Sequence, residues 1–192
     1  MARKRAPGTR DRILDNAGRL FREHGARAVG MQQIVDACGC GKNLVYREFA
    51  SKDDLVAVYL DRCQQEWTAT MDQATLADAG DPAAQLVAMV RAAVAQAESE
   101  DYRGCPFRST LAQFPSEDHP AHRVAVRHAD ELWARLHALA ERAGARDARS
   151  LADQLMLVFD GLYTNGALLG PKGSVGAAVP LAQDIVRAAT GR

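Results

Sequence analysis

The chain has 192 residues and a mass of 20.8 kDa, with 47% hydrophobic residues but few β-branched or aromatic runs, which favours an all-α protein of two unequal domains. It has no apolar stretch of roughly 18 residues and only four cysteines in no secreted-type pattern, which argues against a membrane span or a disulfide scaffold and predicts a cytoplasmic protein. The net charge of +0 hides an asymmetry, because residues 1–50 carry 10 Lys/Arg against 5 Asp/Glu (+5), whereas residues 51–192 carry 14 against 19 (−5). A basic head on an acidic body is typical of a polyanion-binding module joined to a non-binding domain.

Three short helices are predicted within residues 1–50, after a basic and flexible arm at residues 1–8. Thr9 is expected to cap the first helix, which is amphipathic and ends at Gly25. A two-turn second helix stops at Gly39, and a third helix begins at about residue 41 and runs to Phe49. Two short helices joined by such a brief glycine-containing turn are typical of a helix-turn-helix.

Further helices are predicted after residue 50, for a total of about nine helices and no strand. Ser51 should cap the first of them, and Asp81 followed by Pro82 should open the second. The helices that follow are bounded by proline or glycine. The expected spans are about residues 51–77, 82–98, 105–114, a segment that ends at Gly144, a segment that ends at Leu169, and 180–189.

The stretch DACGCGKNLVYREFASKDDL, residues 36–55, admits three interpretations. Cys38 and Cys40 supply only two thiolates, whereas a structural zinc site needs four ligands. Gly41-Lys42 resembles part of a phosphate-binding loop, but Asn43 stands where that loop has Ser or Thr, and no strand precedes it. A helix-turn-helix fits better, with the two cysteines as small apolar fillers at the turn.

A recognition helix must offer donors to phosphates and base edges while its apolar side packs inward. Val45 and Phe49 are expected to face inward, and Lys52 is expected at a helix N-terminus beside a passing phosphate. The alternative is that the polar residues form only a solvated face. The candidate DNA-binding residues are Gln32, Gln33, Lys42, Asn43, Leu44, Tyr46, Arg47 and Lys52.

The segment GCGKNLVYREFASKDDLVAVYL, residues 39–60, closely resembles the recognition-helix signature of the tetracycline-repressor family, which typically reads GVSKGTLYHYFPSKEDLL. The resemblance extends over about residues 9–60, where the first helix ends in LFREHGA and Ile34 and Ala37 take the core positions of the second helix. Several family hydroxyls that contact phosphate are missing. The departures are Gly30 for Ser or Thr, Gly41 for Ser, Leu44 for Thr, and Arg47 for His.

The resemblance implies a DNA-binding domain at residues 1–50 with a flexible basic arm, and a ligand-binding and dimerisation domain at residues 51–192. It implies a repressor that acts as a homodimer on a near-palindromic double-stranded operator and is released by a small apolar or aromatic inducer. No enzymatic activity, cofactor, metal or membrane partner is expected. The rival classes are a helical enzyme or thiol sensor that uses Cys105, for which no nucleophile motif is present, and a structural adaptor.

The same resemblance assigns the dimer interface to the last two helices, which carry leucines and small residues. The alternative is that these residues form an ordinary core within one chain. The candidates for the interface are Leu155, Val158, Gly161, Leu162, Leu181 and Ile185.

Large apolar and aromatic residues recur at core spacing over four or five of the later helices, and they are the candidates for ligand binding. Core packing is the alternative for each one. The set is Trp67, Met71, Phe107, Phe114, Trp133, His137, Met156, Phe159 and Tyr163. Cys105 is either a thiol sensor or an inert small side chain, and His119 with His122 is either a metal pair or part of a surface turn.

Overall fold

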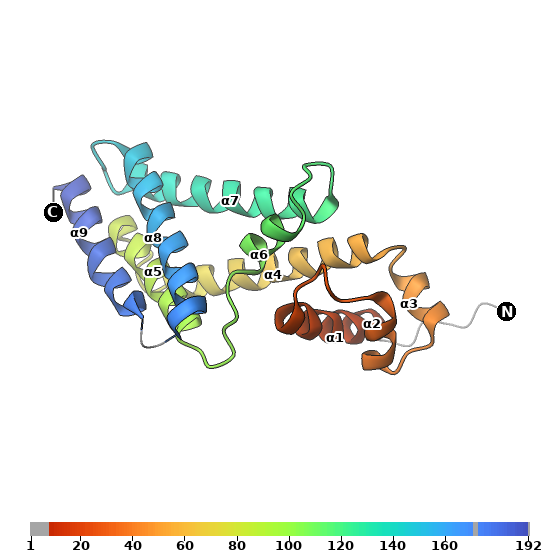
Figure 1. Cartoon of the computed structure of the whole chain (residues 1–192). Helices are drawn as coiled ribbons and strands as arrows, with labels where there is room; N and C mark the ends of the chain where they lie inside the picture. The colour runs from red at the N-terminus through yellow and green to blue at the C-terminus, as the bar shows by residue number, and fades with distance from the viewer. Residues whose placement is uncertain (1–7, 171–172, 192) are drawn as a thin grey trace. The chain divides into compact units, whose positions relative to one another are not determined.

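The computed structural model describes residues 8–170 and 173–191, and in this part of the chain it contains nine α-helices, a 3₁₀ turn and no strand (Figure 1). The expected all-α fold is confirmed, whereas the basic arm predicted at residues 1–8 lies outside the described residues apart from Gly8. None of the described helices is long and apolar enough to cross a membrane. The elements are α1 (Thr9–His24), α2 (Met31–Cys38), α3 (Lys42–Glu48), α4 (Lys52–Thr75), α5 (Pro82–Ala97), α6 (Pro106–Gln113), α7 (Pro120–Arg142), α8 (Ala148–Leu169), η2 (Ser174–Ala177) and α9 (Ala178–Thr190).

The chain divides into two compact units, each built from two stretches of sequence. The first unit contains the chain up to Cys63 together with Pro106–Val126, and the second contains Gln64–Cys105 together with the chain from Arg127 onward. The helices α4 and α7 therefore contribute residues to both units, and α6 belongs to the same unit as α1, α2 and α3. The sequence predicted a boundary at residue 50 between a DNA-binding domain and a ligand-binding and dimerisation domain. This functional assignment of the two parts stays a prediction.

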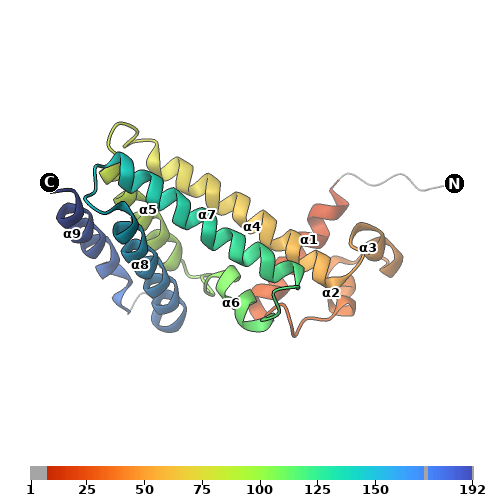
Figure 2. The ribbon, with the colours of Figure 1, turned by 90° about the horizontal axis from the view of Figure 1, so that it is seen from above.

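The first unit contains the three N-terminal helices α1, α2 and α3 (Figure 2), which share a core of apolar residues at helical spacing. Ile13 and Ala17 on α1, Ile34 on α2 and Val45 on α3 are all fully buried. Helices as short as α2 and α3 are marginal in isolation, so their stability depends on this shared core.

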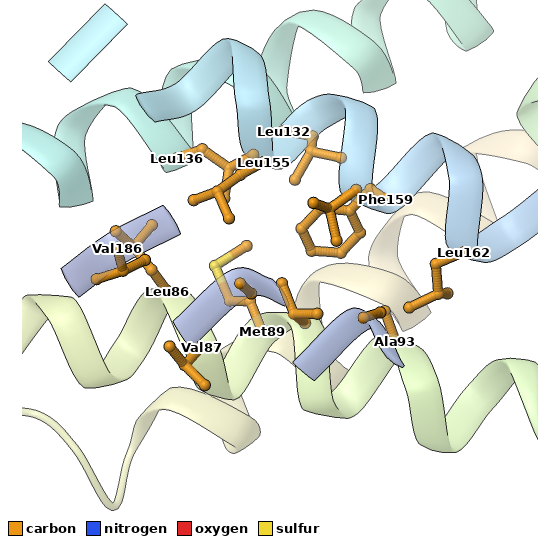
Figure 3. Close-up of a cluster of buried hydrophobic side chains, with 14 of the residues drawn as sticks. Leu86, Val87, Met89, Ala93, Leu132, Leu136, Leu155, Phe159, Leu162 and Val186 are labelled. Carbon is orange, nitrogen blue, oxygen red and sulfur yellow. The ribbon is translucent and has the colours of Figure 1, made fainter. Parts of the chain in front are cut away.

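The second unit has a continuous core to which α4, α5, α7, α8, η2 and α9 contribute, and Figure 3 shows its part between α5, α7, α8 and α9. Met89 on α5, Leu136 on α7 and Leu155 on α8 are completely buried, and the ring of Phe159 is 1% exposed. Gly166 allows α8 to approach α5 closely, because a Cβ atom at this position would lie 2.9 Å from the Cβ of Ala97. The close packing of α8 against α5 therefore requires glycine at position 166.

Most helix boundaries follow the capping residues predicted from the sequence. The Ser51 hydroxyl accepts a hydrogen bond from the Asp54 N–H at 3.0 Å, and Asp81 Oδ1 accepts one from the Ala83 N–H at 3.1 Å at the start of α5. Two expectations were wrong. Thr9 is a buried residue inside α1 and Gly8 is the N-cap, while α9 begins two residues before the expected Pro180 because η2 leads directly into it.

Candidate nucleic-acid interface

The turn between α2 and α3 depends on a glycine in the left-handed region. Gly39 has φ 61° and ψ 25°, a conformation that disfavours other residues, and its N–H donates to the carbonyl of Asp36 at 3.2 Å. Cys38 and Cys40 on either side are 7% exposed, as expected for small fillers. The turn is closed by the Cys40 N–H, which donates to the carbonyl of Val35 at 3.4 Å.

One face of α3 is buried and the other is open to solvent. Val45 is fully buried and Phe49, at its C-cap, is 2% exposed, as predicted. Leu44 is half-buried. The residues that remain exposed are Lys42, Asn43, Tyr46 and Arg47.

The exposed residues of α3 make few contacts within the chain. The ammonium nitrogen of Lys42 lies 5.9 Å from the ring centroid of Tyr46, which is 42% exposed. Arg47 Nε lies 3.9 Å from a carboxylate oxygen of Glu48, whose side chain is buried. This buried carboxylate was not predicted, because on sequence alone Glu48 reads as one more polar residue of the helix.

On α2, both candidate glutamines are exposed but hydrogen-bonded. Gln33 Oε1 accepts a bond from the Gly30 N–H at 2.7 Å, which caps the helix, and Gln32 Nε2 donates to Asp36 Oδ1 at 2.9 Å. Ala37 was expected in the core, but it is exposed. The buried face of α2 consists of Ile34, as expected, together with Val35 and Cys38.

Two basic residues near α3 are engaged with backbone carbonyls. The Lys52 ammonium donates to the carbonyls of Arg27 and Val29 at 2.9 and 3.0 Å, and the side chain is half-buried. Arg10 Nη1 donates to the carbonyl of Glu48 at 2.6 Å. The sequence predicted Lys52 as a phosphate contact and Arg10 only as part of the basic charge of residues 1–50, and no local pattern predicts these distant carbonyl partners.

Cys38 at the turn lies in an environment that favours its thiol form. Burial, followed by the neighbouring Cys40 thiol, raises the pKa of Cys38 to about 11. Arg12 Nη2 donates to Cys40 Sγ at 3.3 Å. Within the described residues there is no cluster of three or more His, Cys, Asp or Glu side chains that could hold a metal ion.

The candidate ligand-binding residues do not form one group. Phe107 and Phe114 belong to the first compact unit, and the other candidates belong to the second. Trp67, Met71, Phe159 and Tyr163 are buried in the core of that second unit.

Trp133 and His137 lie at the edge of the second core and are only partly buried. Their rings stack with centroids 4.9 Å apart, and Trp133 Nε1 donates to Asp153 Oδ1 at 2.7 Å. Met156 packs against the same core and is also partly buried. Sequence spacing grouped these residues with the buried set, because a helical pattern does not distinguish a core from its margin.

A buried polar network crosses the core of the second unit and was not predicted. Trp67 Nε1 donates to the Tyr163 hydroxyl at 3.1 Å, and the Tyr102 hydroxyl donates to the Tyr163 carbonyl at 3.3 Å. His128 is 6% exposed, pairs with the Gln64 side chain and meets the Trp67 ring edge-on at 5.1 Å. Its members come from α4, α7, α8 and the loop between α5 and α6, so no local sequence motif predicts the network.

The candidate dimer residues also separate into two sets. Leu155, Val158 and Leu162 are buried in the core of their own chain, whereas Gly161 is exposed. On α9, Leu181 is 50% exposed and Ile185 is partly buried.

The outer face of α8 carries leucines that sequence reasoning passed over. Leu157 is 71% exposed and Leu168 is 76% exposed. Residues four and eleven positions apart on a helix share a face, so these leucines lie on the same side as Gly161. The helix therefore has two apolar faces, and the eleven-residue spacing of Leu157 and Leu168 was the sequence signal for the exposed one.

The remaining sequence candidates lie in the segment around α6. Cys105 is partly buried and Gly104 precedes it with φ 98°. His119 stacks on Phe114 with centroids 4.2 Å apart and its Nε2 lies 3.3 Å from Asp53 Oδ1, whereas His122 Nδ1 lies 2.9 Å from the Phe114 carbonyl. The two histidines therefore have separate partners.

Comparison with known proteins places the N-terminal helices in a recognised family. The model for bacterial regulatory proteins of the tetR family matches residues 13–59. An uncharacterised HTH-type transcriptional regulator of Mycobacterium tuberculosis is 42% identical over 52 residues, and the HTH-type transcriptional repressor ComR of Escherichia coli is 40% identical over 53 residues. These matches cover 27% and 28% of this chain and only 26% and 25% of the length of those proteins.

Solved structures match over nearly the whole chain. A TetR transcriptional regulator from Streptomyces avermitilis is 31% identical with a TM-score of 0.83, over 94% of this chain and 97% of that one. A TetR-family transcriptional regulator from Streptomyces coelicolor is 26% identical with a TM-score of 0.89, over 95% and 96%. Since both the helix-turn-helix and the helical domain that follows it are shared, this chain belongs to the TetR family of DNA-binding transcriptional regulators.

Proposed function

We propose that the chain is a sequence-specific repressor that binds a near-palindromic operator as a homodimer and is released by a small apolar or aromatic ligand. The observation that carries the proposal is the outward face of α3, where Lys42, Asn43, Tyr46 and Arg47 are exposed while Val45 and Phe49 anchor the opposite face. Two pairs of exposed polar or aromatic residues, one helical turn apart on a short helix behind a glycine turn, suit the major groove.

The chemistry of each exposed side chain suggests its partner in the groove. Arg47 can donate two hydrogen bonds to guanine, and Asn43, one helical turn earlier, can pair with adenine. Lys42 and Tyr46 are suited to phosphate oxygens, and Leu44 to a thymine methyl group. Gln32, Gln33 and Lys52 complete the proposed interface, although each already holds a partner within the chain.

A second copy is the proposed partner of the outer face of α8. Leu157, Gly161 and Leu168 form an exposed apolar stripe, and Leu181 adds to it on α9, which packs directly against α8. One helix-turn-helix reads one half-site, and a two-fold dimer presents two such helices about 34 Å apart. The operator is therefore proposed to be a near-palindrome.

The second unit is the proposed receptor for the ligand. Ligand sites are mainly apolar with a few convergent polar groups, and the core around Trp67, Phe159 and Tyr163 combines aromatic side chains with the polar side chain of His128. Because α4 runs as one helix from Lys52 past Trp67, it links this core to the helix-turn-helix. The ligand must favour a form that fits DNA poorly, so ligand and operator should weaken each other's binding by the same factor, about 5- to 150-fold.

The proposal is tested by DNA selection. Wild-type protein is incubated with a pool of random-sequence duplexes, and the retained fragments are sequenced after several rounds. A shared, near-palindromic sequence is expected, bound by a dimer in sedimentation velocity. Retention without any common sequence, or a monomer on the retained duplex, would show the proposal to be wrong.

A further inference from the structure

The two ends of the recognition helix α3 lack stabilising side-chain caps. It has seven residues, and neither its N-cap, Gly41, nor its C-cap, Phe49, supplies a side-chain capping bond. Isolated helices of this length are unstable in water, because the conformational entropy lost in nucleation exceeds the stabilisation from so few hydrogen bonds. The orientation of α3 must therefore be fixed by contacts from elsewhere in the first unit.

Arg10, in the first turn of α1, contacts the C-terminal end of α3 in two ways. Its Nη1 donates to the carbonyl of Glu48, the last residue of α3, at 2.6 Å. Its guanidinium carbon also lies 4.3 Å from the centroid of the buried Phe49 ring. A cation that satisfies an end carbonyl and complements the negative end of the helix dipole stabilises that end.

The support for Arg10 is rigid on both sides. Ile13 and Ala17 follow it on α1 and are fully buried, and Phe49 is 2% exposed. The contact joins residues 38 positions apart, so it fixes α3 against a different helix and not merely against its own turn. The guanidinium is thus directed at protein groups, although its positive charge alone would place it among the DNA contacts.

We propose that Arg10 is a positioning residue for DNA recognition, which holds the C-terminal end of α3 in place through the Glu48 carbonyl and the Phe49 ring. This inference rests on the proposed DNA-binding role of α3. A positioning residue and a phosphate contact have different signatures. Loss of a phosphate contact weakens binding to every duplex and lowers the salt slope by about 0.9, whereas loss of positioning affects the base contacts.

The test compares Arg10→Ala with Arg19→Ala. Arg19 is a matched control because it lies on the same helix, carries the same charge, and forms an exposed ion pair with Glu23 at 3.1 Å, one helical turn away on α1. Binding is measured by fluorescence anisotropy on two duplexes, one selected by the wild-type protein and one of scrambled sequence. Arg10→Ala is expected to bind the selected duplex about 5- to 30-fold more weakly, which corresponds to about 1–2 kcal/mol, and to bind the scrambled duplex like Arg19→Ala.

Hydrogen exchange in the absence of DNA supplies an independent readout. In Arg10→Ala the amides of residues 45–49 should exchange faster than in the wild type and in Arg19→Ala, because the end of α3 opens more often. Arg10→Lys keeps the charge and a donor, so it should restore most of the protection, and it provides a milder variant if Arg10→Ala melts early. Unchanged exchange in Arg10→Ala, or an equal loss on both duplexes with a lower salt slope, would overturn the proposal. If the wild type selects no sequence, the proposed function fails, while the exchange experiment still decides whether Arg10 holds α3.

Discussion

Gln113 and Arg27 are joined by two hydrogen bonds across 86 positions of sequence. The Arg27 N–H donates to Gln113 Oε1 at 2.8 Å, and the Arg27 guanidinium donates to the Gln113 carbonyl at 2.9 Å. Lys52 donates to the carbonyl of the same Arg27 at 2.9 Å. The loop between α1 and α2 is therefore held by the end of α6 and by the start of α4.

Replacing Gln113 should loosen this loop. In Gln113→Ala the Arg27 N–H loses its acceptor, so the free energy of unfolding is expected to fall by about 0.5–1.5 kcal/mol, as measured by urea denaturation followed by circular dichroism. Gln96→Ala is the control, since Gln96 is exposed and its side chain has no hydrogen bond among those described. Equal stability of the two variants would contradict a structural role for Gln113.

Arg47 should be the most sensitive residue of the proposed interface. If it reads guanine, Arg47→Ala is expected to weaken binding to the selected duplex by about 1–3 kcal/mol and to relax the base preference at one position. Arg47→Lys should recover little, because an ammonium cannot form the same paired hydrogen bonds. Selection repeated with each variant provides the measurement, and an unaltered consensus from Arg47→Ala would remove Arg47 from the base-reading set.

Lys52 should show two separable effects. Lys52→Ala leaves the carbonyls of Arg27 and Val29 without their charged donor. The free energy of unfolding should fall by at most about 1.5–3 kcal/mol, because the side chain is partly exposed. The ammonium has three protons and two of them are used, so the third is expected to reach a phosphate and its loss to lower the salt slope by about one. A stability loss with an unchanged slope would assign Lys52 a structural role only.

The exposed leucines of α8 should control association. Leu157→Glu and Leu168→Glu place a charge on the proposed dimer face and are expected to give folded monomers with reduced operator affinity, as measured by sedimentation velocity and melting. Leu76→Glu is the matched control, because Leu76 is 62% exposed and lies outside α8 and α9. Dimers of unchanged affinity in both α8 variants would place the interface elsewhere.

The Cys38 thiol should be unreactive at neutral pH. Its pKa of about 11 exceeds the ordinary value of 9.0, so the thiol form predominates in the folded protein at pH 8. Because the folded pKa is the higher one, its contribution to stability is complete below pH 9 and is lost as the pH rises through 11. Mass spectrometry after iodoacetamide treatment at pH 8 should find Cys63 or Cys105 modified before Cys38, and early alkylation of Cys38 would disprove its buried state.

Local chemistry made the helix boundaries and the recognition face predictable. Ser51 and Gly39 act on their nearest neighbours, and Val45 and Phe49 face inward because helical spacing decides which side they share. Thr9 was misassigned because its preceding glycine can also cap a helix, and Ala37 because a small residue fits either face.

Interactions between distant parts of the chain were not predictable in the same way. Leucines recur at helical spacings both on the face of α8 that packs on α5 and on the face that remains exposed. Leu155 and Leu157 therefore cannot be assigned to one face or the other without the partner helices. Arg10 and Gln113 contact residues that are distant in sequence and close only in the folded chain. Helical periodicity describes one helix at a time, so it cannot predict such contacts.

A dimer built on the solvent-exposed leucines of α8 and α9 would couple the stability of this protein to its concentration. If a second copy covers Leu157, Leu168 and Leu181, folding and association become one equilibrium, and the apparent melting temperature rises with protein concentration. In a dilute binding assay such a dimer would dissociate and return those side chains to water. The measured stability would then depend on the protein concentration as well as on the sequence.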